Sequence, residues 1–277
     1  MALDFNNEWN FPVELQPVYD QMGNAIPDTK CVMRTDTNDV LGVHGSRYRL
    51  VTNDSIISSV IDAVDEANIS RDYELKIHHA EGGRKMRGEI LFKDMTVQPA
   101  VGDYVHFRVS FFNSYDASWS FQANAEGLRL FCLNGCTTPD GVSRNKFKHT
   151  QSINITGTAD KIMNGLNTFM SSPDIWRSWM ATPVSDEMAE AFFKHTLAKS
   201  FTRQVNHFKT NEKQLEKLLS IWHDERSQLG RNKWALYNAM TYWASHTTDL
   251  KNPEVARRNR EDMIARTMNS NHWMEIA

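Results

Sequence analysis

Basic side chains alternate with apolar side chains along two stretches of this sequence. Lys85 and Arg87 flank Met86, and Arg108 follows Phe107. A period of two predicts β-strands with one face in a core and the other face outside. On the outer face of a sheet, cations can contact phosphates, while aromatic rings and amides can contact bases. The residues that we predict to contact a nucleic acid are Lys85, Arg87, Tyr104, His106, Arg108, Arg129, Arg144, Lys146 and Lys148.

The outer face has a second interpretation. Ser120, Gln122 and Asn124 fall on the same side as the cations if the alternation continues through the next strand. Acidic residues fall there too, so the face can equally be a solvated one held by cross-strand ion pairs to Glu89 and Glu126. The two interpretations differ in whether the cations are available to phosphates.

No stretch of the sequence carries a recognisable catalytic or cofactor-binding motif. There is no G-x-G-x-x-G, P-loop, H-E-x-x-H or G-x-S-x-G pattern. Cys132 and Cys136 lie four positions apart, but no histidines or acids are spaced to complete a metal site with them. We therefore expect no catalytic residues, no metal and no cofactor. An enzyme acting on nucleic acids would need a cluster of metal-binding acids, which the sequence does not suggest.

Composition narrows the classes of protein further. The 277 residues are 40% hydrophobic and 23% charged, which is enough to bury a large core. A net charge of −3 argues against a wholly basic nucleic-acid module, so any binding surface must be local. No apolar run reaches the ~18 residues of a membrane span, and the first residues carry acids where a signal peptide carries basic residues. We therefore expect a cytoplasmic protein that does not enter a membrane.

The periodic stretches predict an α+β fold. A hairpin around residues 36–39 is followed by a helix over 53–67, strands over 73–80 and 84–93, and a hairpin running into a third strand over 103–136. This ββ-α-βββ order predicts a twisted antiparallel sheet covered by helices. Apolar stripes predict helices over the remainder. We expect three regions: an N-terminal arm over 1–30, a β-rich core domain over 31–152 and a helical C-terminal region over 153–277.

Several short motifs, in order along the chain, carry a family resemblance. They are Trp9-Asn10, Pro12-Val13, Arg34-Thr35-Asp36-Thr37, Leu41-Gly42-Val43, Arg47-Tyr48, Val51-Thr52-Asn53, Gly82-Gly83-Arg84, Asn113 to Ser118, Arg129 to Asn134, and Trp234 with Asn238-Ala239. With these motifs the sequence resembles, over nearly its whole length, a phage- and plasmid-like family of unknown function. Cys136 and Thr137 depart from the family pattern, which has a more apolar continuation there. The resemblance implies a phage or mobile-element setting and no particular activity.

The predicted order of elements also resembles the core of Rad52-type single-strand annealing proteins, which form rings and hold single-stranded DNA in a basic groove. This likeness implies a single-stranded DNA-binding and annealing protein that acts in recombination or replication. Its partners would be single-stranded DNA and further copies of itself in a ring or filament. An alternative prediction is an accessory protein that binds a host defence or replication factor and has no affinity for DNA.

Overall fold

The computed structural model describes residues 10–129, 134–136, 144–147, 158–200, 208–209, 211–246 and 251–276. The chain divides into two compact units. Unit 1 comprises Met1–Met95, Phe107–Ala125 and Val142–Asn167, and unit 2 comprises Thr96–His106, Glu126–Gly141 and Thr168–Ala277.

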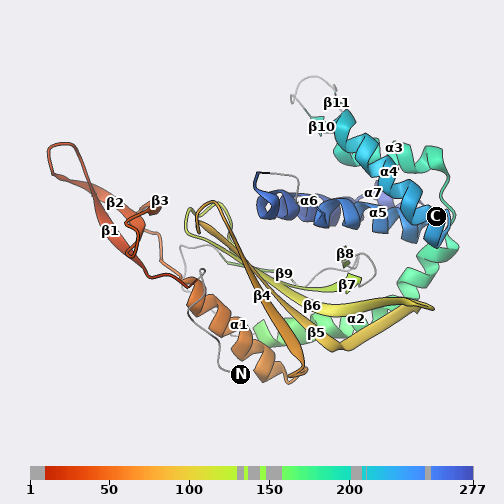
Figure 1. The fold of residues 1–277 in the computed structure, drawn as a ribbon, viewed down its shortest axis with the longest axis horizontal. Helices are drawn as coiled ribbons and strands as arrows, with labels where there is room; N and C mark the ends of the chain where they lie inside the picture. Colours follow the sequence, from red (N-terminus) through yellow and green to blue (C-terminus); the bar gives the residue numbers. More distant parts are fainter. Residues whose placement is uncertain are drawn as a thin grey trace. The chain divides into compact units, whose positions relative to one another are not determined.

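Strands dominate the first half of the chain and helices the second (Figure 1). The strands are β1 (Val13–Tyr19), β2 (Ala25–Arg34), β3 (Val40–Gly45), β4 (Tyr73–Ala80), β5 (Lys85–Ala100), β6 (Asp103–Ser114), β7 (Phe121–Arg129), β8 (Asn134–Cys136), β9 (Arg144–Phe147), β10 (Lys199–Ser200) and β11 (Phe208–Lys209). The helices are α1 (Asn53–Ala67), α2 (Thr158–Ala181), α3 (Asp186–Leu197), α4 (Glu212–Leu229), α5 (Lys233–Ser245), α6 (Pro253–Met268) and α7 (Asn271–Met274). The predicted α+β class, with antiparallel strands and a mostly helical C-terminal half, is confirmed.

Helix α1 forms where its apolar spacing predicted, and its apolar stripe is buried. Thr52 is the N-cap, because its hydroxyl accepts the Ser55 N–H at 3.2 Å. Asn53 is the first residue of the helix. The Asn53 side chain is instead buried and accepts a hydrogen bond from the Asn113 amide at 2.8 Å. Asn53 thus ties the start of the helix to β6 rather than capping it.

Strands β4 to β9 form an antiparallel sheet, which we call the main sheet. Its order is β4-β5-β6-β7-β8, with β9 also paired to β7, and α1 lies along one side of it (Figure 1). On its apolar face the rings of Phe92 and Phe107 are 5.5 Å apart. The ring of Phe111 lies so close to Gly88 that an added Cβ would collide with it. Glycine at position 88 therefore lets an aromatic ring pack directly on the backbone of β5.

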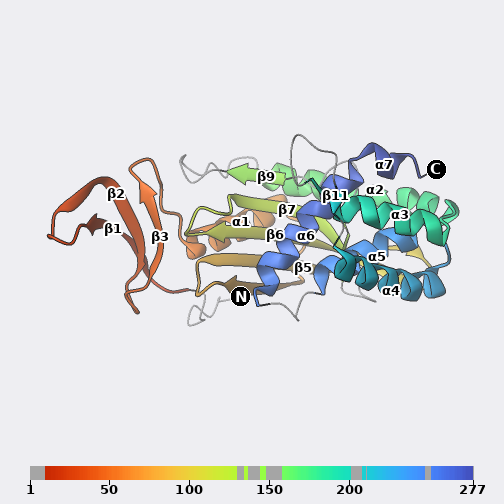
Figure 2. The ribbon, with the colours of Figure 1, turned by 90° about the horizontal axis from the view of Figure 1, so that it is seen from above.

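Strands β1, β2 and β3 form a separate antiparallel sheet, which we call the arm sheet (Figure 2). The sequence predicted an arm without periodicity over residues 1–30 and a single sheet for the rest. In the structure, Val13 to Pro17 pair with Arg34 to Lys30, and the predicted boundary at residue 30 falls within β2. Pro17 is tolerated because β1 lies at the edge of this sheet in the described strand order.

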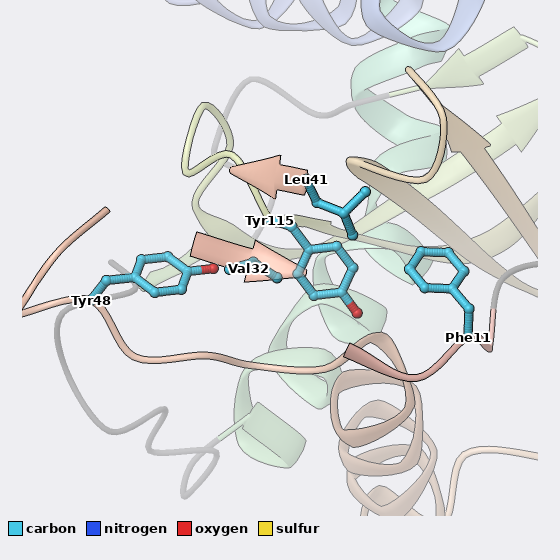
Figure 3. Packing of buried hydrophobic residues seen from close by; sticks show 5 residues of the cluster. All are labelled: Phe11, Val32, Leu41, Tyr48 and Tyr115. Atoms are coloured by element: carbon cyan, nitrogen blue, oxygen red, sulfur yellow. The ribbon is translucent and has the colours of Figure 1, made fainter. Parts of the chain in front are cut away.

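A compact joint holds the arm sheet against the turns of the main sheet (Figure 3). Gly42 lies so close to the Tyr115 carbonyl that an added Cβ would collide with it. Gly83 has a φ of +89° and leaves no room for a Cβ beside the Phe11 ring. His44 Nε2 lies 2.6 Å from the Tyr115 carbonyl oxygen. We define the joint by the residues Phe11, Gly42, His44, Tyr48, Gly83 and Tyr115.

Neutral hydrogen bonds complete the joint around Tyr115. Its hydroxyl accepts the Asn53 N–H at 3.0 Å, and its own N–H donates to the Arg84 carbonyl at 2.8 Å. Burial raises the pKa of Tyr115 to about 12, although the hydrogen bond from Asn53 opposes the rise. Burial also raises the pKa of Tyr48, whose ring stacks on His44 with the ring centres 3.8 Å apart. The phenols of the joint are therefore neutral at physiological pH.

In unit 2 the helices pack around tryptophan rings. Trp176 and Trp234 lie with ring centres 5.3 Å apart, and Trp179 meets Trp273 edge to face at 5.2 Å. The Trp234 indole N–H donates to the Asp103 carboxylate at 3.1 Å. Most residues of α5 are buried.

Candidate nucleic-acid interface

Three charged side chains of β5 lie on the face opposite its apolar residues. Lys85, Arg87 and Glu89 alternate with Met86 and Gly88, so the pleat sends all three to the same side. All three are buried, with exposed fractions of 8%, 1% and 9%. Charges taken out of water are stable only when they are paired or hydrogen-bonded, so their partners decide the character of this face.

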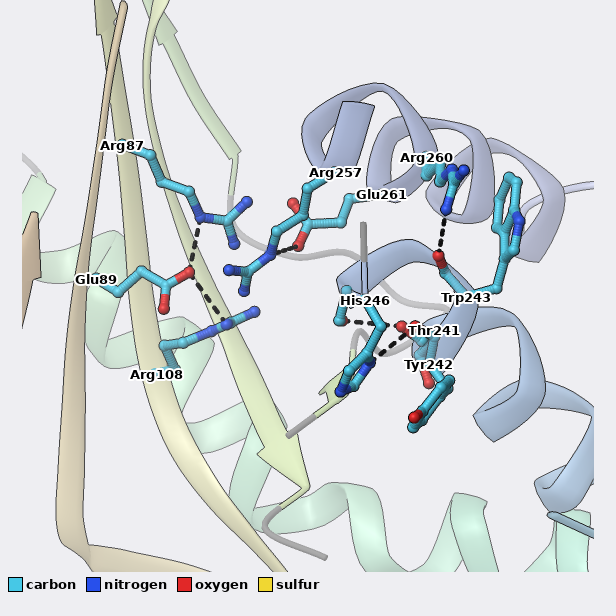
Figure 4. Close-up of polar contacts among 11 residues, drawn as sticks. Arg87, Glu89, Arg108, Thr241, Tyr242, Trp243, His246, Arg257, Arg260 and Glu261 are labelled. Atoms are coloured by element: carbon cyan, nitrogen blue, oxygen red, sulfur yellow. Dashed lines mark hydrogen bonds and ion pairs between the residues drawn. The ribbon is translucent and has the colours of Figure 1, made fainter. Parts of the chain in front are cut away.

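Arg87 and Arg108 share one carboxylate oxygen (Figure 4). Glu89 Oε1 accepts a hydrogen bond from Arg87 Nε at 2.7 Å and a longer one from Arg108 Nη1 at 3.3 Å. The two guanidinium groups meet because β5 and β6 are neighbours in the main sheet. Two arginines and one glutamate carry a combined charge of +1.

Lys85 has different surroundings. Its ammonium lies 2.6 Å from the Glu81 carboxylate and 3.4 Å from that of Asp116. Burial raises the pKa of Asp116, but hydrogen bonds from Ser118 and the charge of Lys85 lower it by more, so the net shift is downward. One lysine and two acids carry a combined charge of −1, which leaves Lys85 no surplus charge for a further anion.

Two aromatic rings connect these charged groups. The Arg87 guanidinium lies 5.3 Å from the centre of the Phe112 ring. Lys85 Nζ lies 5.7 Å from the centre of the Trp119 ring. The two rings meet edge to face with their centres 6.0 Å apart. We call these six residues the charge–aromatic cluster: Lys85, Arg87, Glu89, Arg108, Phe112 and Trp119.

Sequence reasoning missed both rings. It placed Trp119 on the apolar face, in register with Phe121. In the structure β7 begins at Phe121, and Trp119 lies in the preceding turn, where its N–H donates to the Ser114 hydroxyl at 2.9 Å. Trp119 is therefore outside the alternation of the strand and packs on Phe112. For Phe112 a signal was present, because it lies four positions from Arg108 on the same face of β6.

The structure brings together one group of the predicted contacts: Lys85, Arg87 and Arg108. Tyr104 and His106 belong to unit 2. The Tyr104 side chain is 47% exposed, whereas His106 is half-buried with its Nδ1 3.1 Å from the Thr96 hydroxyl. The charge–aromatic cluster lies wholly in unit 1 and does not include these two residues.

The remaining predicted contacts lie at the end of β7 or beyond it in the chain. Arg129 is the last residue of β7. Arg144 and Lys146 lie on β9, which pairs with β7. The positions of these three residues are defined by their backbones. Lys148 lies outside the described residues.

The degree of burial differs from the expected one. The sequence predicted an outer face open to solvent, but Lys85, Arg87 and Arg108 are buried. Each has a carboxylate partner, and pairing allows the cations to leave water. The predicted cross-strand ion pair to Glu89 is confirmed. The side chain of Glu126 is not among those described.

Two features are absent from the described residues. Within them, no three histidine, cysteine, aspartate or glutamate side chains gather as a metal site would require. No helix in the same ranges is both long enough and apolar enough to cross a membrane. Of the cysteine pair, Cys132 lies outside the described residues and Cys136 is placed by its backbone in β8.

Residues 40–269 match a family described as a domain of unknown function, DUF932. The chain belongs to this family. The DUF932 match runs from β3 through α6 and contains the whole charge–aromatic cluster. No curated protein and no solved structure matches the chain. The prediction of an uncharacterised family is confirmed, while the phage or plasmid setting and the likeness to Rad52-type proteins stay predictions.

Proposed function

We propose that this protein binds single-stranded DNA and anneals complementary strands, as a homo-oligomer serving recombination or replication of a phage or mobile element in the host cytoplasm. The observation that carries the proposal is the pair of guanidinium groups of Arg87 and Arg108, which meet over one carboxylate beside the rings of Phe112 and Trp119. Guanidinium groups bind phosphates and aromatic rings stack on bases. The role is binding rather than catalysis.

The proposal requires the charge–aromatic cluster to become accessible. Arg87 and Arg108 have exposed fractions of 1% and 0%, so a strand reaches them only after the groups that cover them move. A conformational change before or during binding slows association. We therefore expect an association rate below that of binding proteins whose basic groove is already open.

A binding titration tests the proposal. A labelled oligo(dT) is titrated with the protein at several salt concentrations and followed by fluorescence anisotropy. We expect Arg108→Gln to weaken binding roughly tenfold and to lower the slope of log K against log salt concentration by about one. Arg177→Gln is the matched control, because it removes an exposed arginine that pairs with Asp174. Circular dichroism establishes that both variants are folded.

Annealing and assembly need their own measurements. Mass photometry with and without the oligonucleotide gives the number of copies in the complex, and energy transfer between complementary labelled strands gives the annealing rate. A discrete oligomer that accelerates pairing supports the proposal. A wild-type protein with no affinity for oligo(dT) at low salt rejects it.

The arm sheet favours a second candidate, a protein that binds a host protein. Around the β1–β2 turn, Tyr19, Met22 and Ile26 have exposed fractions of 58%, 88% and 41%. Apolar side chains gathered at an exposed tip suit a contact with another protein. The double variant Tyr19→Ser and Met22→Ser then loses a host protein that co-purifies with the wild type, while oligo(dT) affinity stays as it was. Equal recovery of that host protein with both forms contradicts this candidate.

A further inference from the structure

The Glu89 carboxylate contacts two arginines at once. One of its oxygens lies between guanidinium groups from two neighbouring strands, 2.7 Å from Arg87 Nε and 3.3 Å from Arg108 Nη1. An oxygen of a phosphate bound by two arginines has the same kind of environment, because guanidinium groups donate to carboxylates and phosphates with similar geometry.

We propose that Glu89 is an internal competitor for phosphate, whose carboxylate holds the position between Arg87 and Arg108 that a phosphodiester group takes when a strand binds. The inference rests on the proposed function for its ligand, since it names the atoms at which DNA enters. It also assigns the two arginines to a phosphate site and excludes Lys85, whose ammonium already lies near two acids.

The exchange is balanced in charge. A phosphodiester carries one negative charge, as the Glu89 carboxylate does, so the combined charge between the arginines is the same before and after the exchange. The contact with Arg108 breaks first, because at 3.3 Å it is longer than an ordinary charged hydrogen bond. Release of the carboxylate to water offsets part of the cost of moving it.

Phe112 keeps one half of the site in place during the exchange. The Arg87 guanidinium lies 5.3 Å from the centre of the Phe112 ring, a contact that does not involve Glu89. Arg87 therefore stays oriented when the carboxylate leaves. This makes Arg87 the residue that positions the incoming phosphate and Arg108 the residue that changes partner.

The test compares Glu89→Gln with Glu74→Gln. Glu74 lies on β4 and forms an ion pair with Lys76 at 3.3 Å, with both side chains about half exposed. The control thus removes the same charge from the same sheet without touching the arginines. Each protein is titrated with oligo(dT) at several salt concentrations, and its melting temperature is measured with and without inorganic phosphate.

We expect Glu89→Gln to bind oligo(dT) roughly tenfold more tightly than the wild type and to steepen the salt slope by about one. We also expect phosphate to raise its melting temperature by more than it raises that of the wild type or of Glu74→Gln. Unchanged DNA affinity together with no extra stabilisation by phosphate overturns the inference.

Two outcomes separate this inference from the proposed function. If no form binds oligo(dT) but phosphate selectively stabilises Glu89→Gln, the proposed function fails and the anion site stands. If the wild type binds oligo(dT) but Glu89→Gln neither binds it better nor gains extra stabilisation from phosphate, the function stands and the competitor role fails.

A second variant guards against misfolding, because Glu89→Gln removes a carboxylate that two buried arginines contact. Glu89→Asp keeps the charge but withdraws it by one methylene group. We expect it to bind oligo(dT) a few-fold more tightly than the wild type, in the direction of Glu89→Gln but by less. Weaker binding by Glu89→Asp shows that the carboxylate supports the site and overturns the inference.

Discussion

The joint and the charge–aromatic cluster belong to the same unit, yet different kinds of interaction hold them together. The joint uses close approach at Gly42 and Gly83 and hydrogen bonds between uncharged groups around Tyr115. The cluster buries four charged side chains and two rings. Close packing and satisfied neutral hydrogen bonds stabilise a fold, whereas a buried ion pair roughly balances its own desolvation. A contribution to stability therefore explains the joint but not the cluster.

Four of the ten motifs behind the family resemblance contribute residues to the joint. Gly42, Tyr48, Gly83 and Tyr115 belong to four separate motifs of the sequence and meet there. Asn113 connects a fifth motif, Val51-Thr52-Asn53, because its amide donates to the Val51 carbonyl at 3.2 Å. The DUF932 match includes these four joint residues and the whole charge–aromatic cluster, whereas β1 and β2 lie before its first residue.

The largest effect should come from filling the closest contact of the joint. Gly42→Ala places a Cβ against the backbone of Tyr115, which cannot move without shifting the whole turn. We expect a loss of about 3 kcal/mol in the free energy of unfolding, measured by urea denaturation. Gly45→Ala is the control in the same strand. A Cβ added at Gly45 would lie 3.8 Å from its nearest neighbour, the Asp28 carbonyl oxygen, which is an ordinary contact distance. Equal losses of unfolding free energy for the two variants would show that the close approach at Gly42 does not stabilise the joint.

A second effect should appear at alkaline pH. Burial raises the pKa of Tyr115 from its ordinary 10.0 to about 12, so between these values the unfolded chain loses a proton that the folded chain keeps. The stability contribution is complete below pH about 10 and is lost as pH rises to about 12, by about 2–3 kcal/mol.

Urea denaturation at a series of alkaline pH values measures this loss. Tyr115→Phe should lower stability at neutral pH by about 1–2 kcal/mol, because the Asn53 N–H loses its partner, but it should also flatten the alkaline decline. Tyr104→Phe, at an exposed position, should keep the wild-type curve. An unchanged decline in Tyr115→Phe would contradict the assignment to this phenol.

The smallest effect on stability should come from removing the charges of the cluster together. We expect the triple variant Arg87→Met, Glu89→Leu and Arg108→Met to unfold within about 1 kcal/mol of the wild type, or to be more stable. Oligo(dT) binding should be lost in the same variant. A large loss of stability in the triple variant would show that the cluster stabilises the fold, as the joint does.

Local periodicity predicted the elements that carry the site. The stripe of α1 and the alternation along β5 and β6 placed the helix and both strands, and they put Lys85, Arg87 and Arg108 on one face. Alternation assigns a side chain to a face but does not say what covers that face or which carboxylate it meets. The burial of the cations and the sharing of Glu89 depend on contacts between strands, which a single sequence does not encode locally.

The arm sheet shows a different limit of sequence reasoning. Pro17 interrupts the pattern of β1, and every side chain of this strand is partly or fully exposed, so no buried face imposes an alternation on its sequence. The joint was also beyond prediction, because Gly42 and Gly83 owe their identity to partners far away in the chain. Trp119 was misplaced because a turn residue follows the geometry of the turn and not the period of the strand.

The tryptophans of the protein are unevenly divided between its units. Unit 2 holds Trp176, Trp179, Trp222, Trp234, Trp243 and Trp273, all buried, whereas Trp119 is the one tryptophan in the described part of unit 1. Intrinsic fluorescence therefore reports mainly on the helices, and a tyrosine-weighted signal reports more on the sheets. Denaturation curves that coincide for the two signals would mean one cooperative transition, and curves that separate would give each unit its own stability.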